Sequence, residues 1–115
     1  MLAMILLLSA NCVFVGPEAF DEGGAEWCEV GIFEQVKVEV DEEQTNFDLE
    51  LHLNAEGITA FSMDPEKFTL FFAEIVGTYA QMGVTANVSF HYGEDQIAHC
   101  FPDWEEKSTV CVSDD

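Results

Sequence analysis

The stretch that decides the fold is residues 64–83, DPEKFTLFFAEIVGTYAQMG. Its large apolar residues recur at the three- and four-residue spacing of an amphipathic helix. Asp64 followed by Pro65 is typical of a helix start, and Gly83 supplies a left-handed stop. We therefore predict one helix over about residues 64–82 whose apolar stripe forms the centre of the core. The stripe consists of Phe68, Phe71, Phe72, Ile75, Val76 and Tyr79.

On the N-terminal side of this helix, the apolar period changes from about 3.6 to two. Residues 30–40, VGIFEQVKVEV, place most apolar side chains on one parity, and residues 46–53, NFDLELHL, alternate in the same way. The polar residues 41–45 between them favour a turn, so the two segments are expected to form a hairpin. Residues 58–63 are predicted to add a third strand.

Beyond the helix, the pattern predicts strands over residues 84–92, 97–101 and 109–112. Residues 16–26 contain a proline and two glycines and are expected to be a loop. The uncharged run 1–10 is too short to span a membrane and lacks a cationic flank, which favours a buried strand over a secretory signal. The expected fold is a single α+β domain over residues 1–115, one antiparallel sheet of five to six strands with the helix on one face.

The charge of the chain is unusual in its sign. Of 115 residues, 23 are acidic, three are lysines and none is arginine, which gives a net charge of −20. Because 49% of the residues are apolar, the chain should fold rather than behave as an acidic disordered tail. Repulsion between the acidic residues lowers the stability of such a domain. We therefore expect these residues to serve interactions with partners or solvent rather than the stability of the fold. The same excess argues against binding nucleic acid, anionic membranes or phosphate groups.

The four cysteines match no zinc or redox spacing. Free thiols are favoured for Cys12, Cys28, Cys100 and Cys111, and one or two disulfides are the alternative in an oxidising compartment. A metal site that combines His99 with Cys100 is disfavoured, because neighbouring residues on a strand point to opposite faces. We therefore expect no metal, no cofactor and no catalytic residue, so the protein is not expected to be an enzyme.

The arrangement of the acids is the most informative remaining feature. In the predicted hairpin, acids of both strands share one face, and two neighbouring strands offer about one same-face position per 3.4 Å, the phosphate spacing along one DNA strand. A second acidic group follows at residues 103–106. The candidate contact residues are Glu39, Asp41, Glu42, Glu43, Asp48 and Glu50, with Asp103, Glu105 and Glu106 as the second group.

These features favour a non-enzymatic inhibitor or interaction protein. Its acidic surface would mimic nucleic acid and occlude the basic site of a nucleic-acid-binding protein or nuclease. The chain resembles anti-CRISPR, anti-restriction and immunity proteins in size and acidity only. Such a DNA mimic would act in the cytoplasm, that of the host cell if a phage encodes it, and would itself bind neither nucleic acid nor membrane.

Two alternatives stay open. An ordinary acidic domain of a halophile would carry the acids to stay hydrated at high salt. A small secreted domain would use residues 1–16 as its signal and bridge its remaining cysteines.

Overall fold

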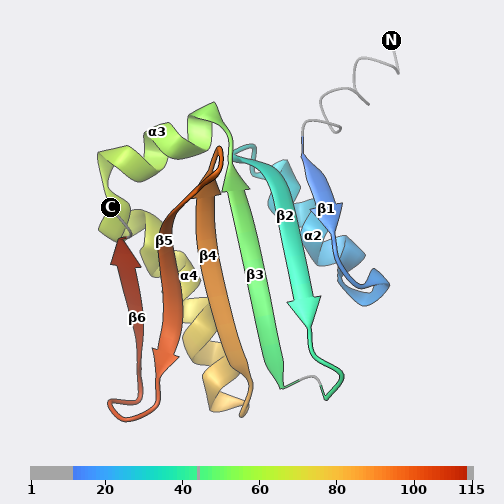
Figure 1. The fold of residues 1–115 in the computed structure, drawn as a ribbon, viewed down its shortest axis with the longest axis vertical. Coiled ribbons are helices and arrows are strands. Elements are labelled where there is room, and N and C mark those ends of the chain that lie inside the picture. Colours follow the sequence, from blue (N-terminus) through green and yellow to red (C-terminus); the bar gives the residue numbers. More distant parts are fainter. Residues whose placement is uncertain (1–11, 44, 114–115) are drawn as a thin grey trace.

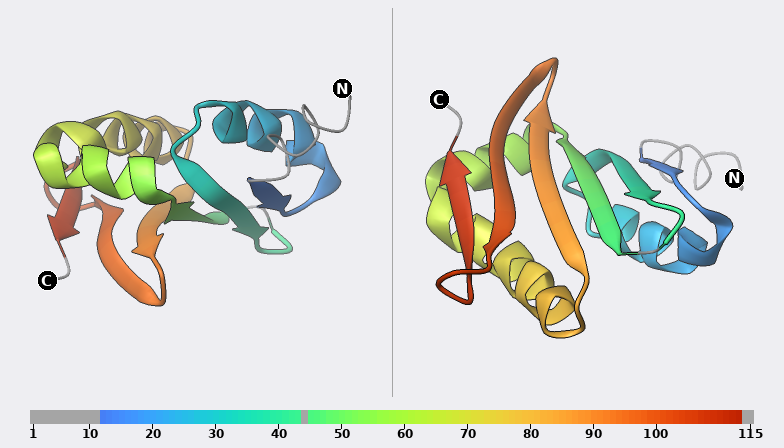
Figure 2. Two further views of the ribbon diagram at one scale, coloured as in Figure 1. Left: turned by 90° about the horizontal axis from the view of Figure 1, so that it is seen from above. Right: turned by 60° about the horizontal axis from the view of Figure 1, so that its bottom comes forward.

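The computed structural model describes residues 12–43 and 45–113 (Figure 1). They form one six-stranded mixed sheet in the order β1-β2-β3-β4-β5-β6. The strands are β1 (Val13–Val15), β2 (Phe33–Val40), β3 (Asn46–Leu53), β4 (Thr85–Tyr92), β5 (Asp95–Asp103) and β6 (Ser108–Ser113). The helices are η1 (Glu18–Phe20), α2 (Asp21–Glu29), α3 (Ala55–Met63) and α4 (Pro65–Gln81). All of these helices lie on one face of the sheet, and no described element covers the other, which we call the open face (Figure 2).

The central helix forms as predicted. The Asp64 side chain accepts a hydrogen bond from the backbone amide of Lys67 at 3.2 Å, Pro65 opens the helix, and Gly83 follows its end with a φ of 80°. Phe72 and Val76 lie in the core, and most of the remaining stripe packs partly buried against it. The exception is Phe71, which is 59% exposed, so its expected place at the centre of the core is wrong.

The sheet is mixed, whereas the sequence suggested an antiparallel one. β1 pairs with β2 and β3 pairs with β4 in parallel, while the other neighbours are antiparallel. Two segments were interpreted wrongly: the expected loop 16–26 contains η1 and most of α2, and the expected strand 58–63 lies in α3. A connection that carries the chain back to the end of the sheet at which the first strand began makes the next strand parallel. The η1–α2 segment does this between β1 and β2, and α3 together with α4 does it between β3 and β4.

Local interactions explain why α3 is a helix. The Asn54 side chain caps it by accepting a hydrogen bond from the Gly57 amide at 2.9 Å. Gly57 lies so close to the carbonyl oxygen of Ile32 that a side chain there would collide with it. Phe61 packs edge-on against Phe68 of α4, with ring centroids 5.6 Å apart. The β-branched and aromatic residues of α3 thus serve helix packing rather than a strand.

A disulfide and one glycine set the packing of the segment before β2. Cys12, next to β1, is bridged to Cys28 of α2. Gly24 of α2 faces the Phe14 ring, which occupies the space that a side chain at this position would need. The helix can approach β1 closely only because glycine stands there.

The predicted hairpin is confirmed as β2 and β3, with one irregularity. A register shift between Phe33 and Gln35 inserts an extra residue into β2. The bulge lets Phe33 and Val36 both enter the core although they differ in parity. The strand begins at Phe33 and not at Val30, because Val30 is the C-cap residue of α2.

The three C-terminal strands are confirmed, with β5 and β6 longer than predicted. Ala86, Val88 and Phe90 of β4 are buried. Cys100 and Cys111 face each other across β5 and β6 and form a second disulfide. All four cysteines are therefore bridged, and the expectation of free thiols is wrong.

The N-terminal run 1–10, for which a buried strand was favoured, lies outside the described residues. Within residues 12–43 and 45–113, no helix combines the length and apolar character needed to cross a membrane.

Candidate interaction surface

The acids of the hairpin strands lie on the open face, as predicted. The strand register sets Glu39 directly opposite Asp48 and Lys37 opposite Glu50. The Lys37 ammonium lies 3.1 Å from the Glu39 carboxylate, and this hydrogen-bonded pair raises the pKa of Lys37, with a smaller contribution from Glu50. Three carboxylates and one ammonium therefore share the middle of this face.

The Asp41 side chain stabilises the turn after β2. Its carboxylate accepts hydrogen bonds from the backbone amides of Thr45 and Asn46, at 2.8 and 3.2 Å, and from both of their side chains. These bonds, led by the one from the Asn46 side chain, lower the pKa of Asp41 to about 2. Asp41 is exposed, but its oxygens already hold the turn that presents Glu42 and Glu43 to solvent.

The second acidic group occupies the turn between β5 and β6. Asp103 accepts hydrogen bonds from the backbone amides of Glu105 and Glu106, both at 3.1 Å, and so shapes the turn. Glu105 and Glu106 are exposed. Between them and Asp103 stands Trp104, which is 54% exposed and which the sequence analysis did not select. Its position between acids was a usable signal, since exposed tryptophan is enriched where proteins bind partners.

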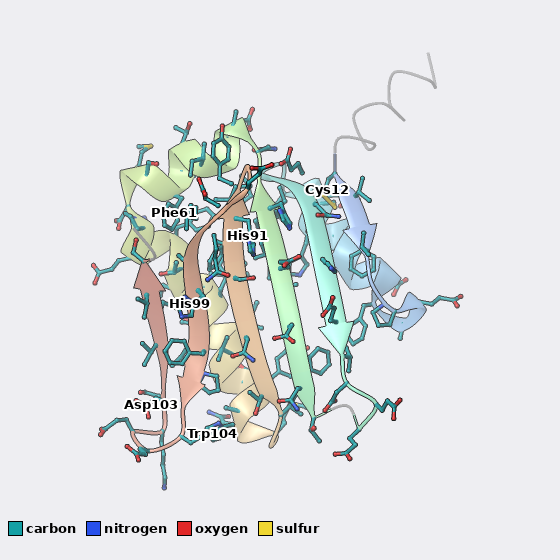
Figure 3. All side chains as sticks on the ribbon, in the orientation of Figure 1. Cys12, Phe61, His91, His99, Asp103 and Trp104 are labelled. Carbon is teal, nitrogen blue, oxygen red and sulfur yellow. A yellow bond between two sulfur atoms is a disulfide. The ribbon has the colours of Figure 1, made fainter. Side chains whose placement is uncertain are left out.

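The two acidic turns lie at the same end of the sheet. β2 and β5 both run toward this end, and β3 and β6 both leave it (Figure 1). Figure 3 shows Asp103 and Trp104 at this end, on the far side from the turn between β2 and β3. We call this region the acidic end. It comprises Asp41, Glu42, Glu43, Asp103, Glu105 and Glu106.

The separation of the two turns follows from the strand order. Their hairpins are centred three strand positions apart. Neighbouring strands lie about 4.8 Å apart, so the two groups are separated by roughly 14 Å across the sheet. This value is close to the width of the B-DNA major groove, about 12 Å, which divides two rows of phosphates.

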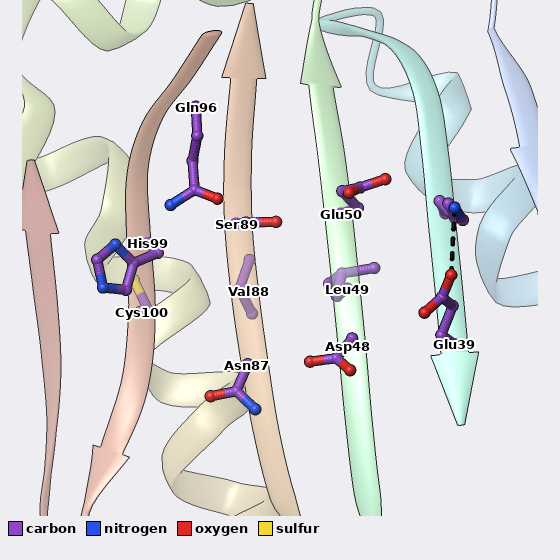
Figure 4. Close-up of a pocket in the computed structure, with 11 residues that line it drawn as sticks. Glu39, Asp48, Leu49, Glu50, Asn87, Val88, Ser89, Gln96, His99 and Cys100 are labelled. Atoms are coloured by element: carbon purple, nitrogen blue, oxygen red, sulfur yellow. Dashed lines mark ion pairs between the residues drawn. The ribbon is translucent and has the colours of Figure 1, made fainter. Parts of the chain in front are cut away.

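The open face also carries a groove of about 330 Å³ in front of β2 to β5 (Figure 4). Its lining combines carboxylates, amides, a hydroxyl, an ammonium and an imidazole. The polar side chains that line it are those of Lys37, Glu39, Asp48, Glu50, Asn87, Ser89, Gln96 and His99.

The other two histidines of the chain lie near Glu50, which lines this groove. His52 and His91 stand side by side on the parallel strands β3 and β4, and their rings stack with centroids 4.7 Å apart. One oxygen of the Glu50 carboxylate lies 3.3 Å from Nε2 of His52 and the other 3.8 Å from Nε2 of His91. Nε2 of His91 shares a shorter hydrogen bond, 2.9 Å, with the Ser89 hydroxyl. Sequence reasoning passed over His52, because the pairing of β3 with β4 depends on the unpredicted helix α3.

His99 and Cys100 project from opposite faces of β5, as neighbouring residues of a strand do. His99 lines the groove on the open face, whereas Cys100 is fully buried on the helical face in its disulfide with Cys111. In the described part of the chain, no group of three or more histidine, cysteine or acidic side chains is placed to hold a metal ion.

Comparison of the chain with models of protein families, with curated proteins and with solved structures finds no match.

Proposed function

We propose that this protein is a non-enzymatic inhibitor or interaction protein whose acidic end occludes a basic, nucleic-acid-binding site on a partner protein or nuclease. The observation that carries the proposal is the placement of two acidic turns at one end of the sheet, roughly 14 Å apart. Two rows of negative charge at this separation are similar to the phosphates on either side of a DNA groove.

The electrostatics of the acidic end favour fast association. A cluster of carboxylates attracts a basic surface over about one Debye length, roughly 8–10 Å at ordinary salt. Such steering raises association rates by a factor of about 10 to 1,000 and falls steeply with ionic strength. Only Lys107 offers a positive charge in the β5–β6 turn, so the region is nearly uniform in sign.

The exposed side chain of Trp104 complements these charges. Long-range attraction selects a basic partner, but a large apolar side chain that becomes buried at the interface slows dissociation. We therefore propose that the glutamates orient the partner and speed its association, and that Trp104 slows its dissociation.

The proposal is tested by charge reversal once the partner has been captured from the source cells. Glu42→Lys/Glu43→Lys should slow association by at least about tenfold and flatten its dependence on salt. The control Glu74→Lys/Glu94→Lys changes the net charge equally at exposed positions on α4 and in the β4–β5 turn, away from the acidic end. Equal slowing in both variants would show that only the total charge matters, and the acidic end would lose its assigned role.

The two disulfides favour a second candidate, a small secreted domain. Disulfides persist in oxidising compartments and are rare in the cytosol, where an anti-CRISPR or anti-restriction protein would act. Cleavage after residue 16 would remove β1 and one half of the Cys12–Cys28 bridge. Secretion would require cleavage before Cys12.

The protein is isolated from the source cells and alkylated without a reductant. The number of labelled cysteines then distinguishes an oxidising compartment from the cytoplasm. No labelled cysteine in the intact mass supports an oxidising compartment, in which the acidic end would meet a basic protein outside the cytosol. Four labelled cysteines support the cytoplasmic inhibitor.

A further inference from the structure

The sheet ends in two edge strands that differ in length and composition (Figure 1). β1 spans only Val13–Val15 and is soon followed by Pro17, so this edge offers few backbone groups. β6 spans Ser108–Ser113, pairs with β5 without a register shift and contains neither a charged residue nor a proline. Among residues 12–43 and 45–113, no strand pairs with the outer side of β6. β6 therefore lacks the charges, bulges and prolines that usually keep a sheet edge from pairing.

The register between β5 and β6 shows which backbone groups of β6 point outward. Cys100 and Cys111 stand opposite each other with their Cα atoms 4.0 Å apart, the short separation of a pair that exchanges no backbone hydrogen bonds. Pro102, which has no amide hydrogen, stands opposite Thr109 in the next pair of the same kind. The amide and carbonyl groups of Thr109, Cys111 and Ser113 therefore point away from β5, toward the free edge.

We propose that the outer edge of β6 pairs with an extended segment of the basic partner, which adds a further strand to the sheet. The segment would have β-branched residues in its middle and lysines or arginines at its ends. This pairing rests on the proposed function, because it needs a basic partner. It differs from the acidic end in that backbone groups, rather than carboxylates, make the contact.

The charges around β6 favour a basic segment over a second copy of this chain. At the start of the strand, residues 103–107 carry three carboxylates and the single ammonium of Lys107. At its end, Glu66 of α4 and Ser113 line the same hollow of about 100 Å³. An uncharged strand with acids at both ends is complementary to a segment with cations at both ends. A second copy would instead bring a net charge of −20 to this edge.

The helical face leaves room for the side chains of an added strand. Sγ of Cys111 lies 3.9 Å from the backbone carbonyl oxygen of Thr69, so α4 passes over β6. Gly77 of the same helix lines a hollow of about 370 Å³ beside the start of β6, together with Asp103 and Trp104. A lysine or arginine of the segment would place its alkyl chain against the exposed Trp104 ring and its charge near the Asp103 carboxylate.

The open face offers an apolar contact to the same segment. Val110 and Val112 point to this face, because Cys111 between them points to the helical face. Val112 is 40% exposed. β-branched side chains of an added strand would cover it as cross-strand neighbours, which is why we expect such residues in the middle of the segment.

The test uses the fluorescent peptide Arg-Lys-Thr-Val-Thr-Val-Lys-Arg as the probe, with binding measured at about 50 mM salt. The control peptide has the same sequence and charge, but every central amide is N-methylated and donates no hydrogen bond. The control should bind at least about tenfold more weakly, because it loses several backbone hydrogen bonds to β6. Equal binding of the two peptides would show that charge alone holds them, and the strand pairing would be wrong.

Ser113→Pro, with Ser113→Ala as its matched control, tests the edge from the side of the protein. The proline removes one outward amide donor and leaves the amides that pair with β5 in place. Ser113→Pro should bind the peptide about fivefold more weakly, as expected for one lost hydrogen bond, and Ser113→Ala should bind like the wild type. Equal affinities of the two variants would contradict the pairing.

Amide hydrogen exchange tests the same edge in the wild-type protein, with no variant that could misfold. Without peptide, the amides of Thr109, Cys111 and Ser113 should exchange faster than those of Val110 and Val112, which bond to β5. Saturating peptide should slow the exchange of the three outward amides, and unchanged exchange would overturn the pairing. If these amides are instead protected by raising the protein concentration without peptide, a second copy occupies the edge and the proposed occupant is wrong.

Failure of the strand pairing is distinguishable from failure of the acidic end. If duplex DNA releases the captured partner but the peptide protects no amide of β6, the pairing is wrong and the acidic end keeps its role. If the peptide protects these amides but DNA does not release the partner, the acidic end loses its role and the edge of β6 remains a binding site.

Discussion

Glu39 and Asp48 lie directly opposite each other on the antiparallel strands β2 and β3, on the face of the sheet that no described helix covers. Like charges in this arrangement lower stability. Asp48→Asn should therefore raise the free energy of unfolding by about 0.2–1 kcal/mol at low salt, with a smaller gain at high salt. Urea denaturation at two salt concentrations measures the effect.

The matched control is Asp95→Asn, because Asp95 faces the uncharged Tyr92 across β4 and β5. It should change stability little. An equal gain in both variants would attribute the effect to net charge and not to the facing pair.

The lowered pKa of Asp41 predicts how the stability of the protein depends on pH. The pKa of this carboxyl is about 2 in the folded protein against an ordinary value of 3.8. A lowered pKa means that the stabilisation is complete above pH 4 and is lost as the pH falls toward 2. Asp41→Ala should lower Tm at neutral pH and reduce the loss of stability in that acid range, whereas Glu43→Ala should leave both unchanged. Thermal melts between pH 2 and pH 7 would contradict this account if the two variants behaved alike.

Two adjacent phenylalanines of α4 should differ sharply. Phe72 is 5% exposed and contacts Phe33, Phe68 and Phe90, whereas Phe71 is 59% exposed. Phe72→Ala should cost about 3–5 kcal/mol through the cavity that it leaves. Phe71→Ala should cost about 1 kcal/mol or less. Chemical denaturation measures the free energy of unfolding of both variants. Comparable losses of this free energy would mean that α4 is rotated relative to the sheet.

Two adjacent glycines of α2 should respond to alanine with opposite signs. Gly23 has open space where a methyl group would lie, so Gly23→Ala should stabilise the helix by about 0.5–1 kcal/mol. Gly24→Ala would place its methyl group inside the Phe14 ring and should destabilise the protein. Melting temperatures that move in the same direction would contradict the packing of α2 on β1.

Trp104 should affect the lifetime of the complex more than its formation. Trp104→Ala should accelerate dissociation from the captured partner by about 30-fold, the equivalent of a contact worth about 2 kcal/mol, with little change in association. Tyr92→Ala provides a control, since Tyr92 is 43% exposed at the opposite end of β4. Surface plasmon resonance separates the two rates, and an unchanged dissociation rate would remove Trp104 from the interface.

Much of the fold could be predicted because local patterns coincide with tertiary packing. The stripe of α4, its Asp64 cap and the alternation of β2, β3 and β4 each point to the element that forms. The errors arise where packing overrides local preference. Gly24 suggested a loop, although it allows α2 to approach Phe14, and Ile58 and Phe61 suggested a strand, although Asn54 caps a helix there.

The same errors concealed part of the candidate site. Without α3, the parallel pairing of β3 with β4 was not predictable, and neither was the stack of His52 on His91. The alternation of apolar and polar residues was enough to predict which face of the hairpin carries the acids. Glu39, Asp48 and Glu50 were therefore placed correctly. That Glu105 would lie at the same end as Glu42 depends on the direction of every strand between them.

Competition with duplex DNA for the captured partner tests the central claim most directly. The partner is bound from source-cell extract to the immobilised protein at about 50 mM salt, and duplex DNA is then added. We predict that DNA releases the partner at this salt concentration. A partner that stays bound at saturating DNA would contradict the claim that the acidic end occupies a nucleic-acid-binding site.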